Sequence, residues 1–184
     1  MKRMKLHGVL LLLGVGVWLA VLSAAAADEK QKAIKESVDV DFARKASASG
    51  MAEVNLSELA VRFARDPAVR QFAQRMIADH RRASTELTQM ANRHSIKLPP
   101  TMDEEHQKLF DKLQKLQGAE FDRAYMEAMV KDHEEVVKLF EAEAKDGKDQ
   151  AMKQWAGKLA PIFKRHLEMA RKVCEQSKGE KKKG

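Results

Sequence analysis

The sequence predicts an all-α fold, namely an antiparallel four-helix bundle with one longer connection that carries a short helix. The chain has only four prolines and one tyrosine, and no stretch alternates apolar and polar residues as a half-buried β-strand would. Four long segments instead repeat apolar residues at helical spacing. Two short turns and one much longer connection separate these segments, which is typical of a bundle with one crossover.

The first 27 residues read as a secretory signal peptide that is removed from the mature chain. Three basic residues precede an apolar run, Val9–Leu22, that is shorter than a membrane-spanning helix requires. Small residues then allow cleavage after Ala27 or, alternatively, after Ala25. An uncleaved anchor is the competing interpretation. Cleavage predicts a protein exported across the inner membrane, periplasmic or peripherally associated with the envelope, with no remaining transmembrane span.

The net charge of +7 comes mostly from the two ends of the chain. The signal peptide carries three positive charges and the tail Lys178–Gly184 a further +3, so Asp28–Ser177 carries only +1. A nucleic-acid-binding protein should show a basic folded part, and we therefore expect no nucleic-acid partner. The segment 175–184 is predicted to be a basic, disordered tail that touches anionic envelope components weakly, if at all.

Helix-breaking residues divide the rest of the chain, 38–174, into the elements of one bundle domain. The first helical pattern covers 38–65 and ends at Asp66–Pro67, an N-cap followed by a first-turn proline. The second covers 67–94, and the prolines within Ser95–Thr101 then exclude a continuous helix. Thr101 and Glu104 predict a capping box for a short helix that ends near Gln117.

Two further long helices complete the predicted bundle. Gly118 interrupts the helical pattern, and a third long helix is expected over 119–145. The turn Asp146–Asp149 then ends that helix and caps the last one, which is expected to end at Cys174. This lone cysteine has no partner for an internal disulfide and reads as an incidental thiol.

Each long helix places one ionisable residue in the middle of its apolar stripe. A buried carboxylate or imidazole without a partner costs several kcal/mol, so four such residues, one on each helix, are expected to meet. Two of them should be level, while the last should lie about one turn, or ~5 Å, deeper, unless a kink at Pro161 moves it. The four residues are Glu53, His80, His133 and His166.

These four side chains are the candidate metal ligands, because neutral imidazoles and a carboxylate bind zinc, copper or iron. A methionine lies one helical turn from each histidine, and these methionines are candidate accessory ligands that would favour copper: Met76, Met129 and Met169. The alternative is a structural polar layer in a non-catalytic envelope protein, where such a layer fixes helix register and the methionines only fill the core.

The sequence predicts no catalytic residue and no organic cofactor site, and it favours a non-enzymatic role. Di-iron oxidases of this architecture need Glu-x-x-His on two helices, but Ile77, Val130 and Phe163 occupy the glutamate positions. Asp79 and Asp132 lie half a helix face from the stripes, and they are expected at the surface or as outer partners of the ligands. No nucleophile–base pair or glycine-rich phosphate loop is present.

Four blocks of the sequence resemble an exported bacterial family of unknown function whose members often carry the label "predicted outer membrane protein". The resemblance covers about 38–173 and implies a ferritin-like helical bundle and an exported protein, but no activity. The family's recurrent glutamate and three histidines fall on the four candidate ligands. The blocks are Gly50–Ala60, Val69–His80, Gly118–Ala144 and Leu159–Ala170.

Overall fold

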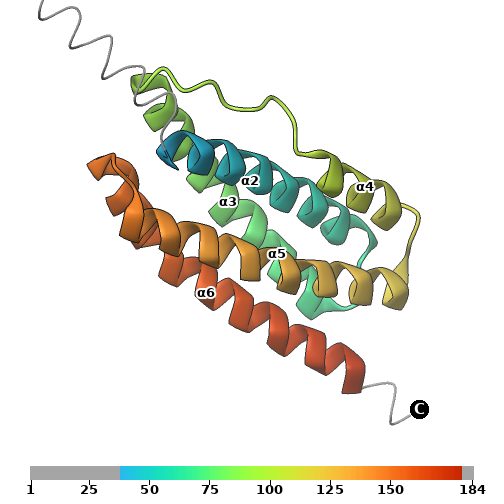
Figure 1. The fold of residues 1–184 in the computed structure, drawn as a ribbon. Coiled ribbons are helices and arrows are strands. Elements are labelled where there is room, and N and C mark those ends of the chain that lie inside the picture. Colours follow the sequence, from blue (N-terminus) through green and yellow to red (C-terminus); the bar gives the residue numbers. More distant parts are fainter. Residues whose placement is uncertain (1–37, 180–184) are drawn as a thin grey trace, which may run out of the picture. The chain divides into compact units, whose positions relative to one another are not determined.

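The computed structural model describes residues 38–179, and all regular structure in this part of the chain is helical (Figure 1). The predicted signal peptide lies outside the described residues. Four long helices and one short helix follow the order expected from the sequence, so the all-α prediction is confirmed. They are α2 (Val38–Phe63), α3 (Pro67–Arg93), α4 (Glu104–Leu113), α5 (Gly118–Asp146) and α6 (Gln150–Gly179).

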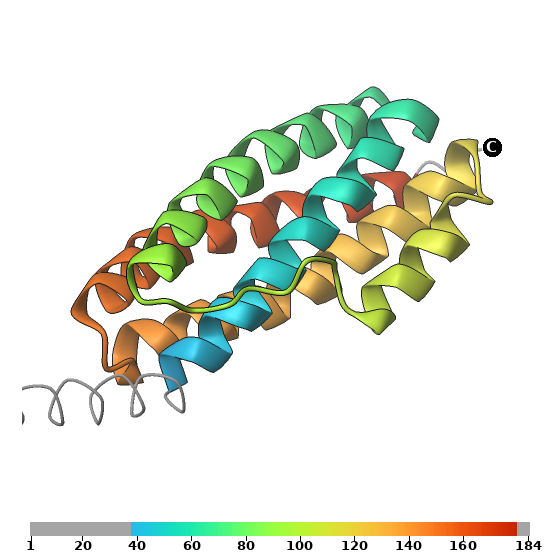
Figure 2. The same ribbon diagram turned by 90° about the horizontal axis from the view of Figure 1, so that it is seen from above.

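The long helices form two hairpins, α2 with α3 and α5 with α6, which pack against each other through α2–α5 and α3–α6 contacts. The connection between the hairpins runs back along the bundle and carries α4 beside α2 and α5 (Figures 1 and 2). As a result α5 starts at the end of the bundle where α3 starts, and the two helices run in the same direction. This is the one-crossover topology that the unequal connections predict.

Buried aspartates fasten the turns of one hairpin to the first residues of the other. Asp122, near the start of α5, accepts hydrogen bonds from the backbone N–H groups of Arg65 and Asp66 at 3.1 and 2.9 Å. At the opposite end, Asp39 of α2 accepts from the N–H groups of Lys148 and Asp149 at 2.7 and 3.1 Å. Because both ends are tied in this way, the register between the hairpins is fixed.

The N-cap of α3 is the residue that the sequence predicts. The Asp66 side chain accepts a hydrogen bond from the Ala68 N–H at 2.7 Å, and Pro67 occupies the first helical position. Asp66→Ala should lower the free energy of unfolding by about 1 kcal/mol, because that N–H then loses its acceptor. Urea unfolding of the variant checks this value, and an unchanged midpoint would show that water replaces the cap.

The predicted cap of the short helix is wrong by two residues. Asp103, and not Thr101, is the N-cap of α4, and its side chain accepts from the His106 N–H at 3.0 Å. Asp103 also contacts the His106 ring at 2.6 Å, so one carboxylate serves two donors. The helix ends at Leu113, and Gly118, with φ of +58°, begins α5. A positive φ is accessible to glycine at little cost.

The last helix is longer than the sequence predicts. α6 continues through Pro161 and reaches Gly179, so its final residues include part of the segment assigned to the tail. Residues 180–184 lie outside the described part of the chain. None of the helices between residues 38 and 179 combines the length and the apolar character needed to cross a membrane.

The core has two apolar regions with a polar layer between them. Aromatic rings fill the region near the α5–α6 turn, where Phe140 packs edge-on against Phe42 and Phe163 at centroid distances of 5.0 and 4.7 Å. Aliphatic side chains, methionines, Phe121 and Tyr125 fill the region near the α2–α3 turn. The polar layer contains the four ionisable residues that the sequence singles out.

Candidate metal centre

Three histidines from three helices meet at the centre of the bundle. His80 of α3, His133 of α5 and His166 of α6 have ring centroids 5.5 to 5.8 Å apart. One ring nitrogen of each lies within 4.8 Å of the other two, and each residue is at most 2% exposed. His166 therefore reaches the other two histidines despite the depth offset expected for it.

Hydrogen bonds fix which nitrogen carries the proton in two of these rings. His133 Nδ1 lies 2.9 Å from the Met129 carbonyl oxygen, and a carbonyl only accepts, so Nδ1 is the donor. His166 Nε2 donates in the same way to Asp79 Oδ2 at 3.0 Å. The lone pairs then lie on His133 Nε2 and His166 Nδ1, and both are buried without a hydrogen-bond partner, as is His80 Nε2.

Burial keeps all three imidazoles neutral. It lowers the pKa of His133 to about 3, with a further contribution from neighbouring His166. Burial also lowers the pKa of His80 well below its ordinary value, and that of His166 is lowered although Asp79 opposes the change. A neutral imidazole is the form that binds a metal ion. This buried histidine triad could therefore hold a metal ion.

The fourth candidate ligand, Glu53, lies beside the triad on the other face of His133. Its Oε1 is 3.2 Å from His133 Nδ1, the nitrogen that points away from the lone pairs. Both carboxylate oxygens are buried without a hydrogen-bond partner. Burial, followed by the charge of Asp132, raises the pKa of Glu53 well above its ordinary value, so the contact joins two uncharged groups.

The three methionines, each one helical turn from a triad histidine along the chain, lie within apolar surroundings. Met76 and Met129 are fully buried members of the core region near the α2–α3 turn, and Met169 is half-buried against the same region. Met129 also contributes the backbone carbonyl that orients His133. This packing accounts for all three side chains as core residues, and their role as thioether ligands stays a prediction.

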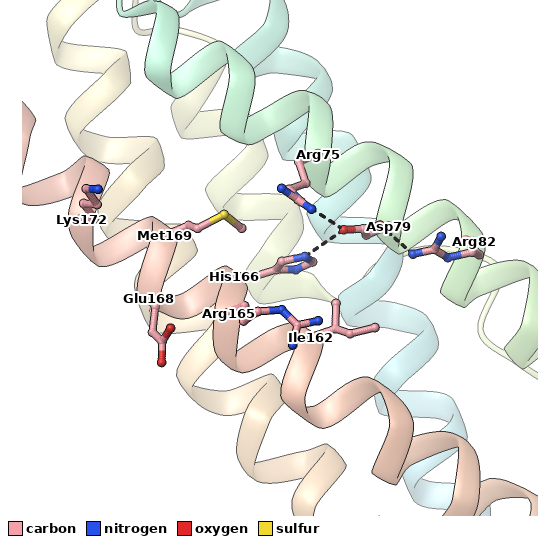
Figure 3. Close-up of a pocket in the computed structure, with 9 residues that line it drawn as sticks. All are labelled: Arg75, Asp79, Arg82, Ile162, Arg165, His166, Glu168, Met169 and Lys172. Carbon is pink, nitrogen blue, oxygen red and sulfur yellow. Dashed lines mark hydrogen bonds and ion pairs between the residues drawn. The ribbon is translucent and has the colours of Figure 1, made fainter.

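Asp79 is the residue whose role the sequence leaves most open. It holds His166 from outside the core and also contacts Arg82 Nη2 at 2.8 Å and Arg75 Nε at 3.7 Å (Figure 3). A carboxylate behind a histidine ligand fixes the ring and raises its basicity. The aspartate directly before His80 is thus an outer partner, although for the histidine of a different helix.

Asp132 precedes His133 as Asp79 precedes His80, but it faces the opposite side of the bundle. Asp132 lies 3.7 Å from His106 Nε2, and burial raises its pKa to about 6. Together with Asp103 and Glu105 it lines a cavity of about 490 Å³ beside α4. The sequence predicts no role for His106, because it lies next to a loop and no helical periodicity indicates that its side chain faces inward.

A further buried carboxylate lies far from the triad, near the α5–α6 turn. Glu143 is 1% exposed, and burial together with the adjacent Asp39 raises its pKa from 4.5 to about 8. Asp149 adds to this effect and Lys153 opposes it. The sequence offers no hint of this pair, because the two carboxylates are far apart along the chain.

Glu143 should make the protein less stable in mild alkali. The unfolded chain loses this proton near pH 4.5 and the folded chain near pH 8, so unfolding releases a proton between these values and stability falls as the pH rises through them. Glu143→Gln should flatten this slope. Melting temperatures of both proteins at pH 6 and 9 test it, and a larger loss in the variant at pH 9 would contradict it.

Fold and centre together define an all-α helical bundle with a buried tri-histidine cluster. The chain belongs to the family "Domain of unknown function (DUF4142)", which matches residues 23–173. Its fold is similar to the crystal structure of a DUF305 protein from Streptomyces coelicolor that is named as a secreted protein. That match has a TM-score of 0.67 and 17% identity, and it covers 77% of this chain and 92% of the other. Among curated proteins, none matches the sequence.

Proposed function

We propose that this protein binds one transition-metal ion in the bundle core through His80, His133 and His166. The observation that carries this proposal is the orientation of the three rings. Each keeps one buried nitrogen without a hydrogen-bond partner, and the Met129 carbonyl and Asp79 hold the protons of two rings on the opposite nitrogens. A purely structural layer would gain stability by pairing these nitrogens, since an unpaired buried polar group costs about 1–3 kcal/mol.

The spacing of the nitrogens suits a metal after a small contraction. Three imidazoles at the zinc–nitrogen distance of about 2.0–2.1 Å in a tetrahedral site have nitrogens roughly 3.3 Å apart. In the structure these nitrogens lie within 4.8 Å of one another. To reach the tetrahedral spacing each ring therefore has to move by less than about 1 Å. Rotation about the side-chain torsions supplies a shift of this size without moving the helices.

Zinc, copper and iron are the ions that this donor set favours, because imidazole binds all three. Three histidines leave a fourth position for another group. Glu53 approaches His133 from the nitrogen that the metal would not use, so we assign it to the outer layer that tunes the site. The nearby methionines supply a soft thioether donor if the ion is Cu(I).

We further propose that the protein is exported across the inner membrane and that its role there is not enzymatic. The signal sequence supports this location, as does the name of a structurally similar protein, which describes that protein as secreted. A bundle that sequesters a metal ion, or responds to one, needs only the buried ligands and their outer partners. The competing function is an envelope protein that interacts with other components and whose polar layer is structural.

Elemental analysis of the untagged mature chain, 28–184, tests the proposal. The metal-free protein is offered Zn²⁺, Cu⁺ and Fe²⁺ separately and then desalted. We expect about one tightly held ion per chain, lost in the His80→Ala/His133→Ala variant and kept in His106→Ala, the matched histidine control. A helical protein that keeps none of the three ions would overturn metal binding and leave the structural layer as the function of these residues.

A further inference from the structure

A cavity of about 430 Å³ lies between α3 and α6, directly outside the triad. His166 and Asp79 line it, together with Ile162 and Met169. Its volume falls within the range of small-molecule sites. A ligand in this cavity would therefore lie next to His166, whose other ring nitrogen, Nδ1, is one of the proposed metal ligands.

Basic side chains dominate the cavity and come from both helices. Arg75 and Arg82 reach it from α3, and Arg165 and Lys172 from α6, whereas only two acidic residues line it. In Figure 3 the three guanidinium groups surround Asp79 and His166, while the second acid, Glu168, points away from them. The inner part of the cavity thus holds three guanidinium groups and one carboxylate.

Asp79 engages only a few of the N–H donors of these arginines. Asp79 contacts one nitrogen of Arg82 and, at the longer distance of 3.7 Å, one of Arg75. Each guanidinium carries five N–H donors, so most remain available. Arg165 has no ion-pair partner among residues 38–179. Asp79 is also shared with His166, which leaves this part of the cavity with excess positive charge.

We propose that this cavity binds a small oxyanion of the phosphate or carboxylate type, held by the guanidinium groups of Arg75, Arg82 and Arg165. Guanidinium forks match two oxygens of such an anion at once, which a lysine ammonium does not. Asp79 and its partner His166 line the same cavity, so an anion held by the arginines lies close to the proposed metal centre. The binding itself does not require that a metal be present, so this inference goes beyond the proposed function.

Titration of the metal-free protein tests the inference independently of the metal. Inorganic phosphate and the tricarboxylate tricarballylate are added at constant ionic strength, and binding is followed by amide chemical shifts. We expect saturable shifts in α3 and α6 around the cavity. Arg165→Gln should weaken binding about tenfold or more, because a hydrogen bond to a charged group is lost.

Arg93→Gln is the matched control, because Arg93 is exposed on α3 outside the cavity lining. It removes the same charge and should leave the affinity unchanged. Equal weakening in both variants would mean that the anion only senses net charge, and would overturn the site. The absence of saturation with either anion would overturn it as well, whether or not the protein holds a metal.

A second arm identifies where such an anion comes from. Phosphatidylglycerol vesicles present the same phosphate chemistry on a membrane surface, and phosphatidylcholine vesicles serve as the neutral control. Co-sedimentation that phosphate competes away and that Arg165→Gln abolishes would identify a lipid headgroup. Phosphate binding without co-sedimentation would identify a free anion. Both results support the cavity as an oxyanion site.

Discussion

Metal loading should raise the melting temperature of the wild-type protein substantially. A ligand that binds only the folded state at a free concentration of about a thousand times its Kd stabilises by ~4 kcal/mol. For a domain of this size that corresponds to roughly 8–16 °C. His133→Ala should lose this increase, because it removes one of the three proposed ligands, whose ring lies 5.6 Å from that of His80 and 5.5 Å from that of His166.

The comparison needs the metal-free proteins as the baseline, since His133→Ala also leaves a cavity in the core. Circular dichroism melts with and without Zn²⁺ give the shift for each protein, and excess chelator should reverse it. His106→Ala keeps the triad intact and should show the full increase. An equal increase in wild type and His133→Ala would place the bound metal elsewhere on the protein and contradict the assignment of the triad.

Most of the fold could be predicted from the sequence because the breaking residues are strong and local. The pairs Asp66–Pro67 and Pro99–Pro100 permit few backbone alternatives, and the helices end within a few residues of where these signals place them. The cap at Asp103 was missed because Thr101, Asp103 and Glu104 all fit local capping rules. Only the path of the connecting loop decides between them.

The triad could be predicted only as far as helix faces and approximate depth. Heptad spacing indicates that His80, His133 and His166 face the core, but the offset expected for His166 depends on how the helices tilt and how α6 passes Pro161. Ring orientation is also beyond the sequence. Whether Glu53 joins the lone-pair side or lies behind His133 depends on side-chain torsions that spacing does not encode.

The outer partners were the least predictable part. Asp79 precedes His80 in the chain, yet it contacts His166 across the α3–α6 interface. Adjacent residues on a helix point about 100° apart, so the sequence shows that Asp79 avoids the apolar stripe but not which neighbouring helix it meets. The arginine-lined cavity arises in the same way, from side chains of two helices whose pairing only the tertiary structure reveals.

Replacing Glu53 should stabilise the metal-free protein and weaken its metal centre. Glu53 is fully buried, and neither oxygen has a hydrogen-bond partner. Methionine has a similar length and no ionisable group. Replacing buried polar or charged groups by well-packed apolar ones often stabilises a fold by 1–4 kcal/mol, and we expect a gain in this range for Glu53→Met.

The same substitution removes the carboxyl group that lies 3.2 Å from His133 Nδ1. Loss of a hydrogen-bonded outer partner of a metal ligand typically lowers affinity 10–100-fold. Because Glu53 contacts the His133 ring without a hydrogen bond, we expect a loss near the lower end of this range. Urea unfolding of the metal-free protein and competitive metal titration of the folded protein measure the two effects separately. Glu53→Gln, which keeps the shape and a polar head, should weaken the metal less and stabilise less.

The sign of the stability change separates the two interpretations of the polar layer. If the polar layer is structural, removal of Glu53 disrupts an arrangement that fixes helix register, and the metal-free protein becomes less stable. If the layer exists for a metal, the buried glutamate is a cost to the empty bundle, and its removal makes the protein more stable. A destabilised Glu53→Met protein with unchanged metal affinity would therefore count against the metal centre.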